Sequence, residues 1–275
     1  MSTDKTVGRR SRRAAITTTT SWFRTLRTEL DDLAATTWHK IEVGPTRGLT
    51  FGEESLTDHN LFELDRRCPG VEVYKFNHNE EVHNGADFEW YVGGQSAGWL
   101  GMRFQAKKLD DGHYLQLGHR TAGVRQYDLL LRNAHLDNMW PLYCFYNGWE
   151  GSWPHGVLNS TCPNKRSPFR LGVQGGCNHA KLEHFGCSLA PADFVAQRHR
   201  AEPRSGRLTL DDYLSVSRPW SNIFTHPTGP AITTTDSALH DLTETLTTWF
   251  TLTSGNWAAE NRDVRLPNGG GRFDR

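Results

Sequence analysis

A cluster of acidic, amide and basic side chains occurs at strand-like spacing between residues 87 and 107. Residues 87–92 are Asp-Phe-Glu-Trp-Tyr-Val, and residues 100–107 are Leu-Gly-Met-Arg-Phe-Gln-Ala-Lys. Side chains alternate between the two faces of a strand, so the apolar residues of both segments share one face. If the segments pair as a hairpin with Val92 opposite Leu100, Asp87 lies opposite Gln105. The pattern therefore predicts a polar face that carries several groups able to do chemistry.

The oxygen atoms on this face are suited to a divalent metal ion. Mg²⁺ prefers hard oxygen ligands, usually one or two carboxylates with water and substrate phosphate. Asp87 offers a carboxylate, Gln105 an amide oxygen and Ala106 a main-chain carbonyl. Glu89, expected opposite Arg103, is a second acid on the same face. We therefore expect a site for Mg²⁺ or Mn²⁺ here.

A lysine and a pair of upstream acids complete the candidate site. Lys107 comes two residues after Gln105, so its side chain is expected on the same face of the strand. There its charge can orient an attacking water and stabilise charge that develops on a phosphate. Glu53 and Glu54 open a predicted helix, and one of them adds an acid if that helix packs beside the hairpin. The alternative is that this polar face is an ion cluster on a half-buried sheet, with each group satisfied by its neighbours.

These residues resemble the PD-(D/E)xK nuclease superfamily, which combines a helix acid, a strand Asp and an (Asp/Glu/Gln)-x-Lys on the next strand. The Gln-Ala-Lys form is most similar to Mrr-type restriction endonucleases, in which Gln replaces the second acid. In the resemblance Glu54 matches the helix acid, with Glu53 as the alternative, and Asp87, Gln105 and Lys107 match the strand residues. The resemblance implies that Glu54, Asp87 and Gln105 bind the metal ion and take part in catalysis. It implies that Lys107 is catalytic without binding the metal.

The resemblance covers about residues 50–147 and extends beyond the hairpin. Gln126 matches a Gln that many members carry on the next helix, and the resemblance implies a catalytic role for it as well. The strand expected over 141–146 matches the core's next strand. Ala86 stands where the pattern has Pro, and Gln at 105 leaves one fewer charge for a metal, which Glu89 is expected to replace. The implied activity is Mg²⁺-dependent hydrolysis of nucleic acid, above all DNA, in defence against foreign DNA.

The whole chain also resembles an uncharacterised prokaryotic family with five shared motifs. These are Glu-x-Leu-Thr-Asp, Asp-x-Glu-Trp, Gln-Ala-Lys, Pro-Leu-Tyr-x-x-Tyr-Asn and Gly-Cys-Ser-Leu-Ala-Pro, here at residues 54–58, 87–90, 105–107, 141–147 and 186–191.

Hydrophobic periodicity and turn residues predict the elements that position this cluster. Helices are expected over residues 22–36, 55–67, 124–136, 191–197, 210–216 and 236–250, and strands over 71–76, 86–92, 99–109, 140–146 and 184–189. The fold class is α/β, a restriction-endonuclease-like mixed central sheet flanked by helices, with C-terminal additions. We expect a flexible basic arm over 1–20, a single domain over 21–260 with an irregular insertion over about 148–180, and a flexible tail over 261–275.

Composition limits the partners and the compartment. Lys and Arg total 31 and Asp and Glu total 31, so the formal charge is zero and a local patch must hold any nucleic acid. No stretch approaches the roughly 20 apolar residues of a membrane span. Arg9-Arg10 resembles a twin-arginine signal, but the threonine run over 17–20 provides no apolar region after it. Five widely spaced Cys predict a reduced, cytoplasmic protein. A homo-oligomer is compatible with the sequence.

Other clusters are weaker candidates for function. Structural zinc would use residues such as Cys162, Cys177, His179, His184 and Cys187, although they lack a Cys-x₂-Cys pair. A phosphate-binding loop of the form G-x-x-x-x-G-K-[ST] is missing from the sequence, which argues against an ATP-driven nuclease.

Two further features have two interpretations each. Trp220 is expected to pack internally, with base stacking as the alternative, and Lys165, Arg166 and Arg170 form either a basic patch or a solvated loop. The enzyme also has rivals: an RNA-cleaving effector, or a nuclease fold that only binds nucleic acid or acts as a scaffold. Gln105 favours the inactive alternative, whereas Lys107 favours catalysis.

Overall fold

The computed structural model describes residues 19–94, 97–121, 123–149, 182–201, 208–209, 212–213, 216–224 and 235–254, with side chains from residue 25 and, in the last helix, from residue 238. The expected basic arm (apart from residues 19–20), the tail and almost all of the expected insertion lie outside these ranges. So do Cys162, Cys177, His179, Lys165, Arg166 and Arg170.

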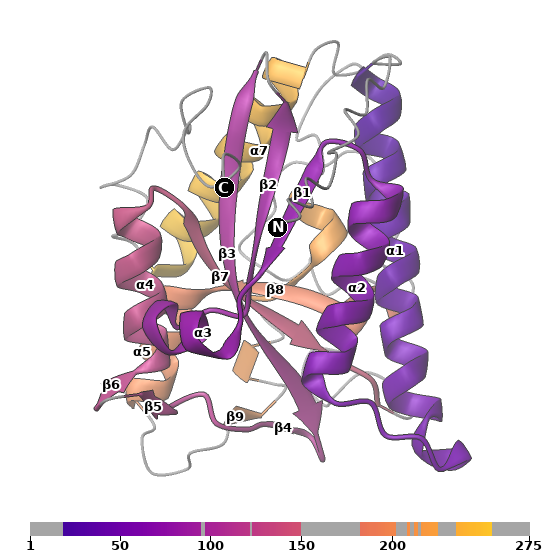
Figure 1. Cartoon of the computed structure of the whole chain (residues 1–275), viewed down its shortest axis with the longest axis vertical. Helices are drawn as coiled ribbons and strands as arrows, with labels where there is room; N and C mark the ends of the chain where they lie inside the picture. Colours follow the sequence, from indigo (N-terminus) through magenta and orange to yellow (C-terminus); the bar gives the residue numbers. More distant parts are fainter. Residues whose placement is uncertain are drawn as a thin grey trace, which may run out of the picture.

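A mixed β-sheet forms the centre of the described protein (Figure 1). Its strand order is β1-β2-β3-β7-β8-β10, and two short strands, β4 and β9, extend it beyond β3. Only β3 and β7 pair in parallel along this path, and the other neighbours are antiparallel. The strands are β1 (Val71–Lys75), β2 (Phe88–Gly94), β3 (Gly98–Asp110), β4 (His113–Tyr114), β7 (Trp140–Tyr146), β8 (Cys187–Pro191), β9 (Leu208–Thr209) and β10 (Arg218–Pro219).

Helices cover both faces of the sheet, as the predicted fold class requires. One apolar core joins the sheet to α1 (Thr19–Val43), α2 (Glu53–Arg67), the 3₁₀ turn η4 (Trp220–Phe224) and α7 (Thr235–Ser254). A second core joins the opposite face to α4 (Gln126–Leu136) and α5 (Ala192–Ala201). The chain is therefore an α/β protein with helices on either side of a mixed sheet.

The β2–β3 hairpin has the predicted register. Val92 pairs with Leu100 and Glu89 pairs with Arg103. The side chains of Phe88, Trp90, Met102 and Phe104 are buried in the first core, at 0–1% exposure. Burial of this apolar face fixes the register, because a slip of one residue would exchange the two faces.

Most element boundaries differ from the predicted ones by a few residues. Residues 140–146 form a strand as predicted, whereas the first helix runs seven residues further, to Val43. The predicted strand over 184–189 is instead a 3₁₀ turn, η3 (Leu182–Gly186), followed by β8. The first two residues of the helix predicted over 124–136 form β6 (Val124–Arg125), which pairs with β5 (Arg120–Thr121).

The helix α3 (His78–Asn84) was not predicted. It has seven residues and none of them is buried, so no apolar periodicity marks it. Asn77 caps it by accepting hydrogen bonds from the N–H groups of Asn79 and Glu80, while the Glu80 side chain accepts from the Asn77 N–H. This capping box was the available sequence signal.

Candidate active site

Asp87 lies where the chain enters β2, directly beside β3. Its N–H donates to the Phe104 carbonyl over 2.8 Å, which continues the ladder by one residue. Its Oδ2 accepts from Gln105 Nε2 over 2.5 Å and from the Ala106 N–H over 2.6 Å. The predicted meeting of Asp87 with Gln105 is therefore present.

The amide oxygen of Gln105 is a buried acceptor with no partner among the described residues. The side chain is 1% exposed, and its Nε2 donates to Asp87 and to the Ala106 carbonyl while Oε1 accepts nothing. A buried polar atom without a partner is costly and needs an explanation. A cation beside Oε1 would satisfy it, and the carboxylate, amide and carbonyl oxygens here are the ligand types that Mg²⁺ prefers.

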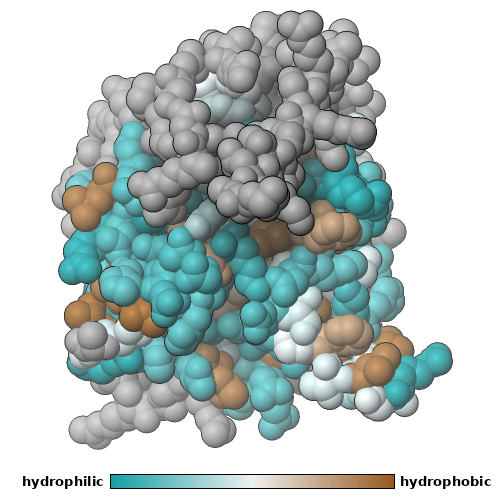
Figure 2. Space-filling view, in the orientation of Figure 1, coloured by the Kyte–Doolittle hydropathy of each residue, from teal (hydrophilic) through white to brown (hydrophobic). Residues whose placement is uncertain are grey.

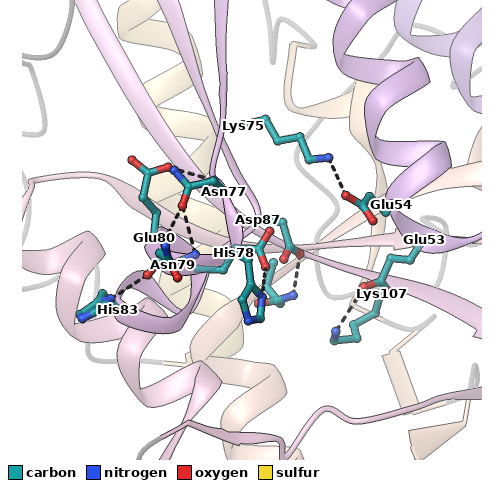
Figure 3. A network of polar contacts seen from close by, with 12 residues as sticks. Glu53, Glu54, Lys75, Asn77, His78, Asn79, Glu80, His83, Asp87 and Lys107 are labelled. Carbon is teal, nitrogen blue, oxygen red and sulfur yellow. Dashed lines mark hydrogen bonds and ion pairs between the residues drawn. The ribbon is translucent and has the colours of Figure 1, made fainter. Parts of the chain in front are cut away.

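The helix acid that reaches the hairpin is Glu53 and not Glu54 (Figure 3). Glu53 Oε2 accepts from the Lys108 N–H over 2.8 Å, and Glu53 Oε1 lies 3.4 Å from Lys107 Nζ. Glu54, 84% exposed, instead pairs with Lys75 over 3.2 Å. The assignment of Glu54 as the helix acid was therefore wrong, and Glu53 occupies that position. Successive helical residues point about 100° apart, so only one of two adjacent acids can face the same strand.

Glu89 does not take part in the candidate metal site. Its carboxylate is fully buried and accepts from Arg103 Nε over 2.7 Å and from the Tyr91 hydroxyl over 2.6 Å. Arg103 also contacts Asp137 over 2.6 Å. The prediction that Glu89 is a metal ligand is therefore corrected, because a carboxylate already paired with a buried guanidinium is not free to bind a cation.

The surroundings of Asp87 disfavour the ionised form of its carboxyl. Loss of water around the group raises its pKa to about 7, and the nearby charges of Glu53 and Glu81 act in the same direction. The charge of Lys107 and the Ala106 N–H oppose the rise. A cation bound here would relieve the cost of ionising Asp87.

Glu81 on α3 is a further acid of this cluster that the sequence analysis missed. Its charge interacts with those of Asp87, Lys107 and Lys75. Partial burial raises the pKa of its carboxyl, while the positive charges of its neighbours lower it. Because α3 was not predicted, nothing placed Glu81 beside the hairpin.

Gln126 is the first residue of α4, so it lies on the helix that follows the Gln-x-Lys strand, where the resemblance expects a Gln. Its main-chain carbonyl lies against Gly85, at the position that a Cβ would take there. Gly85 has φ +69° and precedes Asp87 by two residues. The start of α4 therefore lies close to the candidate site.

The described zinc candidates are explained by packing. Cys187 is buried, accepts a hydrogen bond from Asn60, and burial raises the pKa of its thiol to about 12. His184 lies 3.6 Å from Asp31. Within the part of the chain that the structure describes, no group of three or more His, Cys, Asp or Glu is arranged to hold a metal. A cation at Asp87 would therefore depend on amide, main-chain and water oxygens as well.

Trp220 packs internally, in agreement with its first interpretation. It is 1% exposed, and its indole N–H donates to the Leu30 carbonyl over 2.6 Å. No base could stack on it in this position.

A comparison with protein families identifies the chain. Residues 26–267 match a family of unknown function, DUF6615. The chain belongs to the DUF6615 family. The match spans the helices, the sheet and the whole candidate site. No match was found among curated proteins. Among the described helices of this DUF6615 protein, none is both long and apolar enough to cross a membrane.

Proposed function

We propose that this DUF6615 protein is a Mg²⁺-dependent nuclease that hydrolyses phosphodiester bonds of DNA. The observation that carries the proposal is that Asp87 contacts Gln105 and Glu53 contacts Lys107 on neighbouring positions of one strand, where the buried amide oxygen of Gln105 has no partner among the described residues. The order acid helix, Asp strand, Gln-x-Lys strand, helix and parallel strand agrees with the nuclease core that these residues resemble. A role in defence against foreign DNA is proposed on that resemblance.

The residues have separable tasks in this reaction. Asp87, Gln105 Oε1 and the Ala106 carbonyl would hold the metal ion, which supplies Lewis-acid stabilisation of phosphate oxygens and a more acidic water. Lys107 provides a fixed positive charge for the water and for charge that develops on the phosphate. Glu53 accepts from the main chain at Lys108 and thereby keeps its second oxygen beside Lys107.

The test is cleavage by the purified full chain. Wild type and Asp87→Asn are incubated with plasmid DNA, single-stranded DNA or RNA, each with Mg²⁺ or with EDTA. We expect wild type with Mg²⁺ to cleave DNA, and the variant and the EDTA samples to leave it intact. Cleavage of RNA alone would change the substrate to that of an RNA-cleaving effector. Binding without cleavage of any substrate would favour the inactive nuclease fold and contradict the proposal.

A further inference from the structure

A group of arginines surrounds the start of α4, outside the candidate active site. Arg120 and Arg125 pair across the β5–β6 ladder, and Arg198 and Arg200 come from the end of α5. Figure 1 shows β5 and β6 beside the start of α4 and the end of α5. The face seen in this orientation is mostly hydrophilic over its described part (Figure 2).

Two of these arginines have no acidic partner among the described residues. Arg198 pairs with Asp212 over 3.1 Å and Arg200 pairs with Asp128. Arg120 instead donates to the Gly123 carbonyl over 2.8 Å. Among the described residues Arg125 likewise contacts neutral groups, Tyr127 and His199. The described part of this surface therefore retains two positive charges, in a protein whose formal charge is zero.

Neutral side chains hold Arg125 in one position. Its NH1 donates to the Tyr127 hydroxyl over 2.5 Å and to His199 Nδ1 over 3.1 Å, and its guanidinium lies 5.7 Å from the centre of the Tyr127 ring. A guanidinium only donates, so His199 Nδ1 must accept and the imidazole is neutral. Burial and the charge of Arg125 both lower the pKa of His199. The His199 ring packs against Gly118, where a Cβ would clash with it.

The start of α4, which directly follows Arg125, lies near the candidate active site. Arg125 directly precedes α4, and the first turns of α4 contact Gly85, two residues before Asp87. The Asn133 side chain of α4 also donates to the His83 carbonyl of α3 over 2.8 Å. If one phosphate of a nucleic-acid strand lies at Asp87, the phosphates before and after it in the strand must lie over the surface next to the site.

We infer that Arg125, with Arg120 beside it, is a binding site for a backbone phosphate of the substrate strand that flanks the phosphate hydrolysed. The inference rests on the proposed function for the identity of the strand. Arginine suits this task because its planar fork donates two parallel hydrogen bonds to phosphate oxygens. Contacts to the backbone position a strand without reading its sequence.

The experiment measures binding of a fluorescent DNA oligonucleotide by anisotropy, over a range of salt concentrations. All proteins carry Asp87→Asn so that cleavage does not interfere. Arg125→Gln and Arg120→Gln are compared with Arg66→Gln, a control on α2 whose exposed guanidinium pairs with Glu63. We expect each test variant to weaken binding about 10-fold at low salt and to reduce the slope of log Kd against log salt by about 1, with no change in the control.

The outcomes separate this inference from the proposed function. Unchanged affinity and slope in both test variants, while the wild-type protein cleaves DNA, would overturn the inference alone. The expected loss of binding, combined with a wild type that cleaves nothing, would support the phosphate site and contradict hydrolysis. A protein that neither binds nor cleaves DNA would overturn both. Thermal melting checks folding. If Arg125→Gln unfolds, Arg120→Gln still tests the inference, because the described hydrogen bond of the Arg120 side chain is to an exposed carbonyl, that of Gly123.

Discussion

At the scale of single residues, two adjacent glutamates on α2 have different partners. Glu53 contacts Lys107 and the main chain at Lys108, whereas Glu54 contacts Lys75 (Figure 3). The sequence could not decide between them, because the choice depends on how α2 is rotated against the sheet. The Thr57 side chain helps to fix that rotation, since its hydroxyl bonds Tyr146 of β7 over 3.0 Å.

The two glutamates give a matched test of the helix acid. Glu53→Gln should lower the initial rate of DNA cleavage by at least about 10-fold, because the charge beside Lys107 is lost. Glu54→Gln makes the same change one residue away and should leave the rate unchanged. Equal rates in the two variants would remove Glu53 from the site.

The raised pKa of Asp87 predicts how stability depends on pH without metal. An unfolded Asp has a pKa near 3.8, and the folded group has one of about 7. The folded state therefore binds the proton more tightly, and its stability should fall as pH rises from about 4 to 7 and then level off. Urea unfolding in EDTA measures this profile, and Asp87→Asn should flatten it. An unchanged profile in the variant would show that Asp87 is not the titrating group.

At the scale of elements, the hairpin was the most predictable part of the protein. Alternation of apolar and polar residues over 87–107 was sufficient to give the β2–β3 register, because one face had to be buried. The same pattern placed Glu89 opposite Arg103, but it could not show that their ion pair would keep Glu89 out of the metal site, since residues of one face compete for partners in three dimensions. The short helix α3 and its Glu81 were missed because α3 has no buried face.

Two neighbouring residues of β3 test the two faces of the hairpin. Phe104 is fully buried and stacks on Phe88 with ring centres 4.8 Å apart, so Phe104→Ala should cost about 3–5 kcal/mol of unfolding free energy. Gln105→Ala removes an amide whose oxygen accepts nothing among the described residues but whose Nε2 donates to Asp87 and to the Ala106 carbonyl. It should cost about 1–2 kcal/mol, less than Phe104→Ala, while it impairs metal binding. Denaturant unfolding of both variants provides the comparison, and a larger loss for Gln105→Ala would contradict the assignment of faces.

Gly85 couples α3 and α4 to the position of Asp87. A Cβ there would lie 2.7 Å from the Leu130 N and 2.8 Å from the Leu129 Cβ, at a φ of +69°. Gly112 has a similar φ of +74° but open space around it. Gly112→Ala should therefore cost only about 1–2 kcal/mol for the backbone conformation, and Gly85→Ala should cost more and reduce cleavage. Similar losses of thermal stability in the two variants would show that the contact with α4 is unimportant.

At the scale of the whole molecule, the fold class followed from the alternation of helical and strand patterns. The packing of α1, α2 and α7 on one face and of α4 and α5 on the other could not be read from any single segment. A formal charge of zero indicated that binding of nucleic acid would need a local positive surface. We propose that the arginines at the start of α4 provide this surface, and they come from segments more than 70 residues apart in the chain.

Turnover by Lys107→Met tests the central claim most directly. The change keeps most of the buried stem and removes the charge beside Glu53. Lys108→Met is the matched control, because it makes the same change on the opposite face of β3 and leaves the main-chain N–H that binds Glu53. With saturating Mg²⁺, Lys107→Met should lower the single-turnover rate of DNA cleavage by roughly 10² or more while DNA affinity is retained, and Lys108→Met should cleave at the wild-type rate. A Lys107→Met protein that cleaves DNA as fast as wild type would contradict the assignment of this site as the nuclease centre.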